Sequence, residues 1–329
     1  MGPTKTPLVN EVDWSRLFHA YGVAADTSRH LQGLVSDDDA AFADGLDHLH
    51  GAVLHQGTVY PATVPSLRVV AGMLHDPALR RRDDHGKSRL ASLLEWIDAV
   101  GDSASWHEDT HESDTPEPTD EDVDAFYRAM AADDESVWDS EVNDYLWGRS
   151  IAELPAACGE ALTSVSTYLT DDDPAIRACA ALSLMDSAEA TALLVEALHD
   201  PLAADVWFAR RPSCFDIRVH FALVANLLAR DAGLAELLPA FLPVIRAAKG
   251  RLWSNMTWGP ILLKAFPGVE FQPGVRPDPP RNLDEAQKAV LRELVANNDL
   301  WDGGDGNANL ARMRVGLPDD RDAVAALAS

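Results

Sequence analysis

Hydrophobic residues recur at helical spacing along most of this chain, and this periodicity constrains the fold more than any other feature. The stretch 59–74 places apolar residues at i, i+3 and i+4, on one face of a helix, and the stretches 90–100, 217–228, 234–245 and 283–294 repeat the pattern. Strand signals are nearly absent, since there is no sustained alternation of β-branched residues and no Asn-Gly or Asp-Gly hairpin between apolar runs. The sequence therefore predicts an all-α protein.

A weak internal repeat relates two of the helical regions. The stretch 34–49 aligns without gaps to 169–184: in both, an apolar residue ends a short helix, three aspartates form a polar turn, and an alanine-rich helix follows. Aspartate suits this place because a carboxylate caps and favours the N-terminus of a helix. The turns at His75–Pro77 and His199–Pro201 repeat the arrangement in shorter form.

These residues carry a resemblance to a known class of repeats. The segment LTDDDPAIRACAALSL, with Asp173 and Arg177 around its turn, resembles the second helix of HEAT repeats. The stretches HLHGAVLHQGTVYPATVPSLRVV and NNDLWDGGDGNANLARMRVGLPDDRD are similar to a bacterial HEAT-repeat subfamily whose members mostly have no assigned function. The resemblance implies an α-solenoid, in which helix pairs stack because no pair buries its apolar face alone. It implies a style of binding surface and does not imply a reaction.

The 329 residues exceed what one compact core usually holds, so we expect either two domains or one elongated array. The expected architecture is an α-solenoid of HEAT-like helix pairs with an acidic insertion and a C-terminal helical extension. Its parts are N-terminal helix pairs in 1–100, an acidic mobile linker or insertion in 101–120, central helix pairs in 121–272, and a Pro/Gly linker with a helical cap in 273–329. Asn282 and Glu285 come close to a capping box, which predicts the start of the last long helix there.

Charge is distributed unevenly. The formal net charge is −26, and the segment 101–141 holds fifteen acidic residues and one arginine, a net charge of −14. The segment 205–264 holds eight Lys or Arg and four acidic residues, a net charge of +4. The overall acidity argues against nucleic acid and anionic lipid as partners. It leaves a protein or peptide partner, and an acidic one would fit the basic segment.

The N-terminal stretch, the apolar runs and the cysteines of the sequence predict where in the cell the protein is located. The N-terminal stretch MGPTKTPLVNEVDW lacks the apolar core of a secretory signal, and no apolar run approaches the 18 residues of a membrane helix. Cys158, Cys179 and Cys214 are odd in number and far apart, which suits a reducing cytoplasm. We expect a cytoplasmic protein in which Cys158 and Cys179 are core residues and Cys214 is the candidate for a reactive thiol.

The stretch His107–His111 spells HEDTH, the pattern with which zinc hydrolases bind their metal on a helix. Its flanks are Ser, Asp and Pro, so no apolar face would hold a helix, and a third ligand at the usual spacing is missing. We interpret it as part of a solvated acidic linker.

The stretch DGGDGNANL resembles a calcium loop from Asp305 to Asn309. Leu310 and Gly316, however, stand where an EF-hand needs Gly and Glu. We predict instead a Gly/Asn turn that lets Trp301 pack back on the last long helix. No metal and no cofactor is predicted.

Aromatic and guanidinium groups gather in DVWFARRPSCFDIRVH and RLWSNMTWGP, and together these groups form binding hot spots through cation–π and bidentate carboxylate contacts. The predicted contact residues are Trp207, Arg210, Arg211, Arg218, Trp253 and Trp258. The alternative places Trp253 and Trp258 in the core and leaves the arginines to balance the acidic surface. The run Arg80–Arg82, with Lys87 and Arg89, is expected to be a solvated loop between repeats.

Two functions follow from these features. The first is a protein- or peptide-binding module with no chemistry of its own. The second is an unusual enzyme with a small-molecule pocket in the solenoid groove, whose acid, base or anion-binding groups would be Asp216, Arg218, His220, His55 and Tyr60. For His55 and Tyr60, the structural alternative is that they tie a turn by hydrogen bonds. Nucleic-acid binding is the weaker third candidate, left open by the basic segment.

Overall fold

The computed structural model describes residues 7–82, 86–105, 115–185, 187–197, 226–248, 258–267, 277–301 and 306–329. These residues are mostly helical, which confirms the all-α prediction. The chain divides into two compact units, Met1–Ser183 and Leu184–Ser329, and each is described by itself. Among the described residues no helix is both long and apolar enough to cross a membrane.

The first unit holds one small hairpin and a group of helices. In chain order they are α1 (Pro7–Glu11), β1 (Phe18–His19), β2 (Gly22–Val23), α2 (Thr27–Gly33), α3 (Asp39–His48), α4 (Thr63–Met73), α5 (Arg89–Ser105), α6 (Asp120–Ala131), α7 (Glu141–Ser166) and α8 (Pro174–Leu182). Shorter 3₁₀ turns lie at Trp14–Arg16, Ala24–Asp26, His55–Gly57, Pro77–Arg80 and Glu135–Asp139, and a π-helical turn follows α3 at Leu49–Val53.

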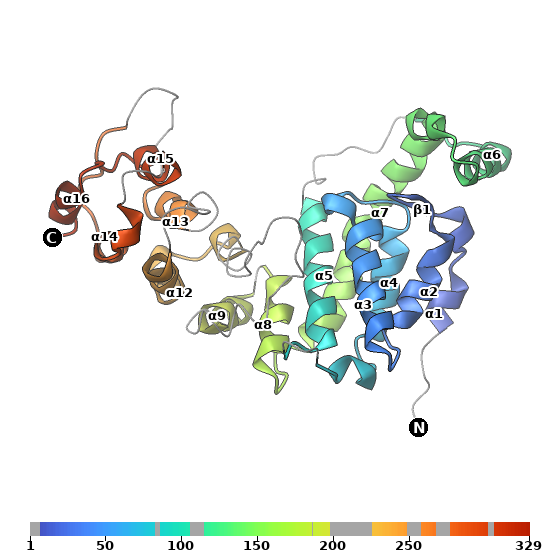
Figure 1. The fold of residues 1–329 in the computed structure, drawn as a ribbon, viewed down its shortest axis with the longest axis horizontal. Helices are drawn as coiled ribbons and strands as arrows, with labels where there is room; N and C mark the ends of the chain where they lie inside the picture. Colours follow the sequence, from blue (N-terminus) through green and yellow to red (C-terminus); the bar gives the residue numbers. More distant parts are fainter. Residues whose placement is uncertain are drawn as a thin grey trace. The chain divides into compact units, whose positions relative to one another are not determined.

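The core of this unit forms where α3, α4, α5 and α7 lie side by side (Figure 1). Trp96 of α5 is fully buried there, and its indole N–H donates to the carbonyl of Leu49 at 3.1 Å. Helix α4 packs against α7, and α5 packs against α7 and α8. Helices on both sides of the predicted linker 101–120 belong to the first unit, which ends at Ser183, and residues 106–114 lie outside the described residues.

Three aspartate turns have the same local geometry, as the repeat analysis predicted. Asp38 precedes α3, Asp76 precedes the turn Pro77–Arg80, and Asp173 precedes α8. In each, the carboxylate accepts a hydrogen bond at 2.9 Å from the backbone N–H two residues later. This contact satisfies a donor that the first helical turn leaves without an intrahelical partner.

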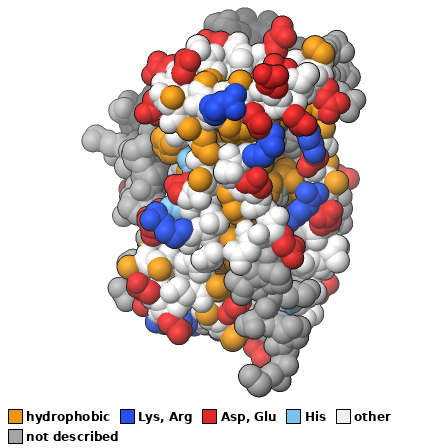
Figure 2. All heavy atoms as spheres, turned by 90° about the vertical axis from the view of Figure 1, so that its right-hand side faces the viewer, with side chains coloured by type: hydrophobic (Ala, Val, Ile, Leu, Met, Phe, Trp, Pro, Cys, Tyr) orange, Lys and Arg blue, Asp and Glu red, His pale blue; other side chains and the backbone are white. Residues whose placement is uncertain are grey.

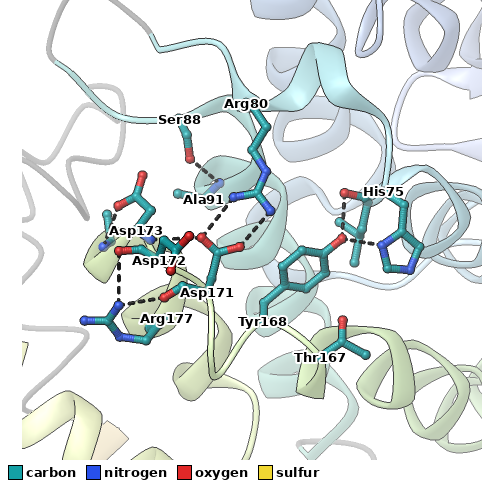
Figure 3. A network of polar contacts seen from close by, with 12 residues as sticks. His75, Arg80, Ser88, Ala91, Thr167, Tyr168, Asp171, Asp172, Asp173 and Arg177 are labelled. Carbon is teal, nitrogen blue, oxygen red and sulfur yellow. Dashed lines mark hydrogen bonds and ion pairs between the residues drawn. The ribbon is translucent and has the colours of Figure 1, made fainter.

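The loop expected to be solvated is exposed at Arg80–Arg82, as predicted, whereas Lys87 and Arg89, expected to belong to it, are buried. Arg80 donates two hydrogen bonds to the carboxylate of Asp171, at 2.9 and 2.7 Å (Figure 3). Arg82 pairs with Asp173. The Asp171 side chain is only 8% exposed, so this pair lies partly inside the unit. The turn before α8 concentrates carboxylates, and the arginines of the loop neutralise them.

The loop and the start of α5 also form ion pairs with the aspartate turn that precedes α3. Arg81 and Arg89 both approach the carboxylate of Asp39, at the start of α3. Arg89 is buried, and Lys87 is buried in an ion pair with Glu95. A buried charge is costly unless it is paired, so these partners explain how two basic residues of a supposed surface loop are accommodated inside the unit.

The second unit consists of helices in its described part. They are α9 (Ala188–Ala197), α12 (Leu234–Ala247), α13 (Trp258–Ala265), α14 (Glu285–Ala296), α15 (Gly306–Arg314) and α16 (Arg321–Leu327), with a 3₁₀ turn at Asn298–Leu300. Helix α12 packs against α9, α13 and α14, and α14 packs against α16.

The last long helix begins two residues later than predicted. Asp284 is the N-cap of α14 and forms the capping box with Gln287, whereas Asn282 adopts a positive φ of 56° and lies outside the helix. The predicted return of Trp301 onto this helix is confirmed, because its indole N–H donates to the carbonyl of Leu294 at 2.8 Å.

Candidate functional site

A hairpin near the N-terminus carries the first side chains of the candidate site. Strands β1 and β2 pair through His19 and Gly22, so Ala20 and Tyr21 form a two-residue turn. Gly22 has a φ of +111°, a conformation that glycine adopts without strain. The N–H of Ala20 donates to the carbonyl of Ala52 at 3.1 Å, which ties the turn to the helical body.

Three histidines and a carboxylate meet beneath this hairpin. One nitrogen or oxygen atom each from His19, Asp26 and His48 lies within 4.8 Å of the other two. The ring centroids of His19 and His48 are 5.1 Å apart. His30 stacks on His48, with centroids 4.1 Å apart and ring planes 8° apart. We call His19, Asp26, His30 and His48 the histidine cluster.

Hydrogen bonds indicate which nitrogen of a neutral His19 ring carries the hydrogen. The backbone N–H of Tyr21 donates to Nδ1 of His19 at 3.2 Å, so in the neutral ring Nε2 carries the hydrogen and donates it to Asp26 Oδ1 at 3.1 Å. Partial burial opposes ionisation of Asp26, but the hydrogen bond from His19 and the charge of the neighbouring imidazoles outweigh it and lower the pKa of Asp26.

His48 is held as a neutral imidazole. Burial, and after it the charge of His30, lowers the pKa of His48 to about 4. Its Nε2 lies 2.9 Å from the hydroxyl of Thr27, and Nδ1 of His30 lies 2.9 Å from Asp44 Oδ2. The cluster therefore offers the neutral imidazole of His48 beside the ionised carboxylate of Asp26 at neutral pH.

The cluster is buried on one side and accessible on the other. His19 is 4% exposed, whereas the Asp26 side chain is 48% exposed. Tyr21, at the hairpin tip, is 71% exposed, and its hydroxyl lies 3.4 Å from Nδ1 of His55. Figure 2 shows the face on the side of α1, α2, β1 and α6, where hydrophobic and histidine side chains reach the surface between acidic and basic ones.

The chain matches no protein-family model, no curated protein and no solved structure. The resemblance to HEAT repeats therefore stays a prediction from the residues that suggested it.

Most of the predicted contact and catalytic residues lie outside the described residues. They are Trp207, Arg210, Arg211, Asp216, Arg218, His220 and Trp253, together with Cys214 and the stretch 107–111. Trp258 is described, and its ring is 1% exposed in the core of the second unit, as the alternative interpretation placed it. Cys179 is buried in the core, as predicted, and Cys158 is partly buried.

His55 and Tyr60 make different contacts in the structure. His55 Nδ1 lies 2.8 Å from the carbonyl of Gly51, a hydrogen bond that ties the turn as the structural alternative predicted. The Tyr60 ring packs against Phe18 at 6.4 Å between centroids, in the small core next to the hairpin. Burial raises the pKa of Tyr60.

Sequence reasoning missed His19, Asp26 and His30. The spacing of Asp26 and His30, one helical turn apart, is a weak signal that these two side chains share a face. His48 and His50 are two residues apart and would lie on different faces of a helix, so their spacing predicts no shared site. No sequence spacing indicates that His19, on the hairpin, lies beside His48, at the end of α3.

Proposed function

We propose that this chain is a HEAT-like helical-repeat protein that binds a protein or peptide partner, and that the tip of the β1–β2 hairpin belongs to its contact surface. The observation that carries the proposal is Tyr21, an aromatic side chain that is 71% exposed on a closely held turn. Tyrosine is enriched in binding hot spots because it buries a large ring at a low cost in conformational entropy.

Several hydrogen bonds hold the turn in place, which favours a role of the exposed Tyr21 side chain in binding a partner. The Tyr21 N–H is bonded to the His19 ring, and the Ala20 N–H is bonded to Ala52. The carbonyl of Phe18 accepts from the N–H of Ala62 at 3.1 Å. A side chain on such a preorganised turn loses little further freedom when a partner binds it.

The solenoid part of the proposal is supported by the repeated turns. Asp38, Asp76 and Asp173 cap their helical turns in the same way. The arginine loop 80–82 contacts both the turn before α3 and the turn before α8. Recurrent turns joined by neighbouring segments are what stacked helix pairs produce.

The test compares the wild-type chain with Tyr21→Ala and with Leu263→Ala as bait in affinity purification from cells that express the chain. Leu263, on α13, is 42% exposed and serves as the matched control for loss of an exposed apolar side chain. We expect a partner that wild type and Leu263→Ala retain equally.

The dissociation constant of that purified partner, measured with each variant, decides whether Tyr21 belongs to the contact surface. A hot-spot truncation costs at least about 2 kcal/mol, so Tyr21→Ala should weaken Kd by about 30-fold or more. Circular dichroism should show the same helical content for all three proteins. A partner bound equally well by Tyr21→Ala would remove the hairpin tip from the contact surface.

A further inference from the structure

We propose that the histidine cluster binds a divalent transition-metal ion, with zinc as the best match, through one atom each of His19, Asp26 and His48. The argument for this site does not use the partner-binding function, but the two share the hairpin, because the His19 ring accepts the hydrogen bond that holds Tyr21.

The donor set fits this class of metal. Two imidazole nitrogens and one carboxylate oxygen make up the kind of mixed set that zinc accepts, whereas calcium and magnesium prefer oxygen alone. With bonds of about 2.0–2.1 Å, the ligand atoms of a tetrahedral ion lie about 3.3 Å apart. His19 Nε2 and Asp26 Oδ1 are already 3.1 Å apart, and all three donors lie within 4.8 Å. Closure around an ion therefore needs side-chain movements on the order of 1 Å.

The surroundings also suit a metal. The ring of His30 stacks on that of His48, with centroids 4.1 Å apart, and holds the His48 imidazole in place beside Asp26. A dication at the site would take lone pairs from His19 and His48 and balance the charge of the Asp26 carboxylate. Asp26 is half exposed, so an ion can reach the site from solvent and keep a water molecule as its fourth ligand.

Metal binding has a structural consequence at the hairpin. For Nε2 of His19 to bind an ion, its hydrogen must move to Nδ1, and Nδ1 then no longer accepts from the backbone N–H of Tyr21. No proton is lost from the ring in this exchange. The tip of the hairpin must therefore rearrange when the metal binds, and the Tyr21 amide reports on it.

The first experiment titrates the metal-free protein with Zn²⁺ by calorimetry and with Co²⁺ by visible absorption. We expect one ion per chain and the absorption of a tetrahedral Co²⁺ site. Asp26→Asn and His48→Ala should each weaken binding by more than about 100-fold, because loss of a partner outside the first ligand shell already costs about 10–100-fold. Asp26→Asn is nearly isosteric at a half-exposed position, so it keeps the test valid if His48→Ala does not fold.

Two controls separate this site from other histidines. His50→Ala removes an exposed imidazole two residues from His48, and His107→Ala with His111→Ala removes the pair in the acidic stretch. Both controls should bind the ion like wild type. Loss of binding in the His107/His111 control, undiminished binding in Asp26→Asn and His48→Ala, or no binding by wild type would each overturn the proposal.

The second experiment observes the hairpin directly. The chain has five tyrosines, so ¹⁵N-tyrosine labelling yields five backbone amide signals, and Tyr21→Phe identifies the one from Tyr21. We expect this signal to shift on addition of stoichiometric Zn²⁺. A Tyr21 amide that stays unchanged while zinc binds would show that the ion does not use Nε2 of His19.

Discussion

The ion pair between Arg80 and Asp171 gives the most direct test of how the first unit is held together. The two groups are 91 residues apart in sequence and meet through two parallel hydrogen bonds of 2.9 and 2.7 Å. Asp171 Oδ1 also accepts from the backbone N–H of Asp173 at 3.0 Å. Asp171→Ala therefore removes three hydrogen bonds, two of them charge-assisted.

The expected loss in free energy of unfolding depends on how exposed the two side chains are. Exposed pairs contribute about 0.2–1 kcal/mol, and breaking a buried pair costs about 3–5 kcal/mol. Arg80 is 52% exposed and Asp171 is 8% exposed, so the pair falls between these limits. We expect Asp171→Ala to lower the free energy of unfolding by about 2–3 kcal/mol, Arg80→Ala by about 1.5–2 kcal/mol, and the coupling energy to be about 1–1.5 kcal/mol.

The assay is urea denaturation of wild type, the two single variants and the double variant, followed by circular dichroism, with the slope m required to stay constant. Arg149 and Glu153 form the matched control, an i,i+4 pair on α7 with side chains 64% and 43% exposed, whose coupling should be about 0.5 kcal/mol or less. A coupling between Arg80 and Asp171 no larger than the control would refute the view that this contact stabilises the unit.

Three further measurements follow from the structure. Burial opposes ionisation of Asp171, but hydrogen bonds from Arg80 outweigh it and lower the pKa of this carboxyl. The ionised carboxylate therefore stabilises the fold above the unfolded pKa of about 3.9, and this contribution is lost at lower pH. The difference in free energy of unfolding between wild type and Asp171→Asn should close as pH falls below about 4. Trp96→Phe leaves the carbonyl of Leu49 without its indole donor and opens a cavity, so thermal unfolding should show a free energy of unfolding lower by about 2–3 kcal/mol. A decrease under about 0.5 kcal/mol would contradict the packing around Trp96. Burial raises the pKa of Cys158 to about 11 and that of Cys179 well above its ordinary value, so mass spectrometry after iodoacetamide treatment of the native protein at pH 8 should find both unmodified, with rapid labelling of Cys158 as the contrary result.

Several features of the fold were predictable because their causes lie within a few residues. Apolar spacing predicted α4, α5, α12 and α14, since one face of each must be buried. The aspartate turns were predictable because the carboxylate and the N–H it caps are two residues apart. Even here competition between neighbours shifted one boundary, as Asp284 rather than Asn282 became the cap of α14.

Contacts between distant segments were decided by the tertiary structure. The sequence predicts that the arginine run at 80–82 is exposed, but its pairing with Asp171 and Asp173 depends on the packing of α5 against α8. The histidine cluster likewise needs the hairpin to fold over the end of α3, which places His19 beside His48. The sequence by itself determines which residues cap helices, which form turns and which face of a helix is buried, because these interactions join residues at fixed spacings. Which charges and imidazoles meet depends on how whole helices pack, and no short pattern encodes that.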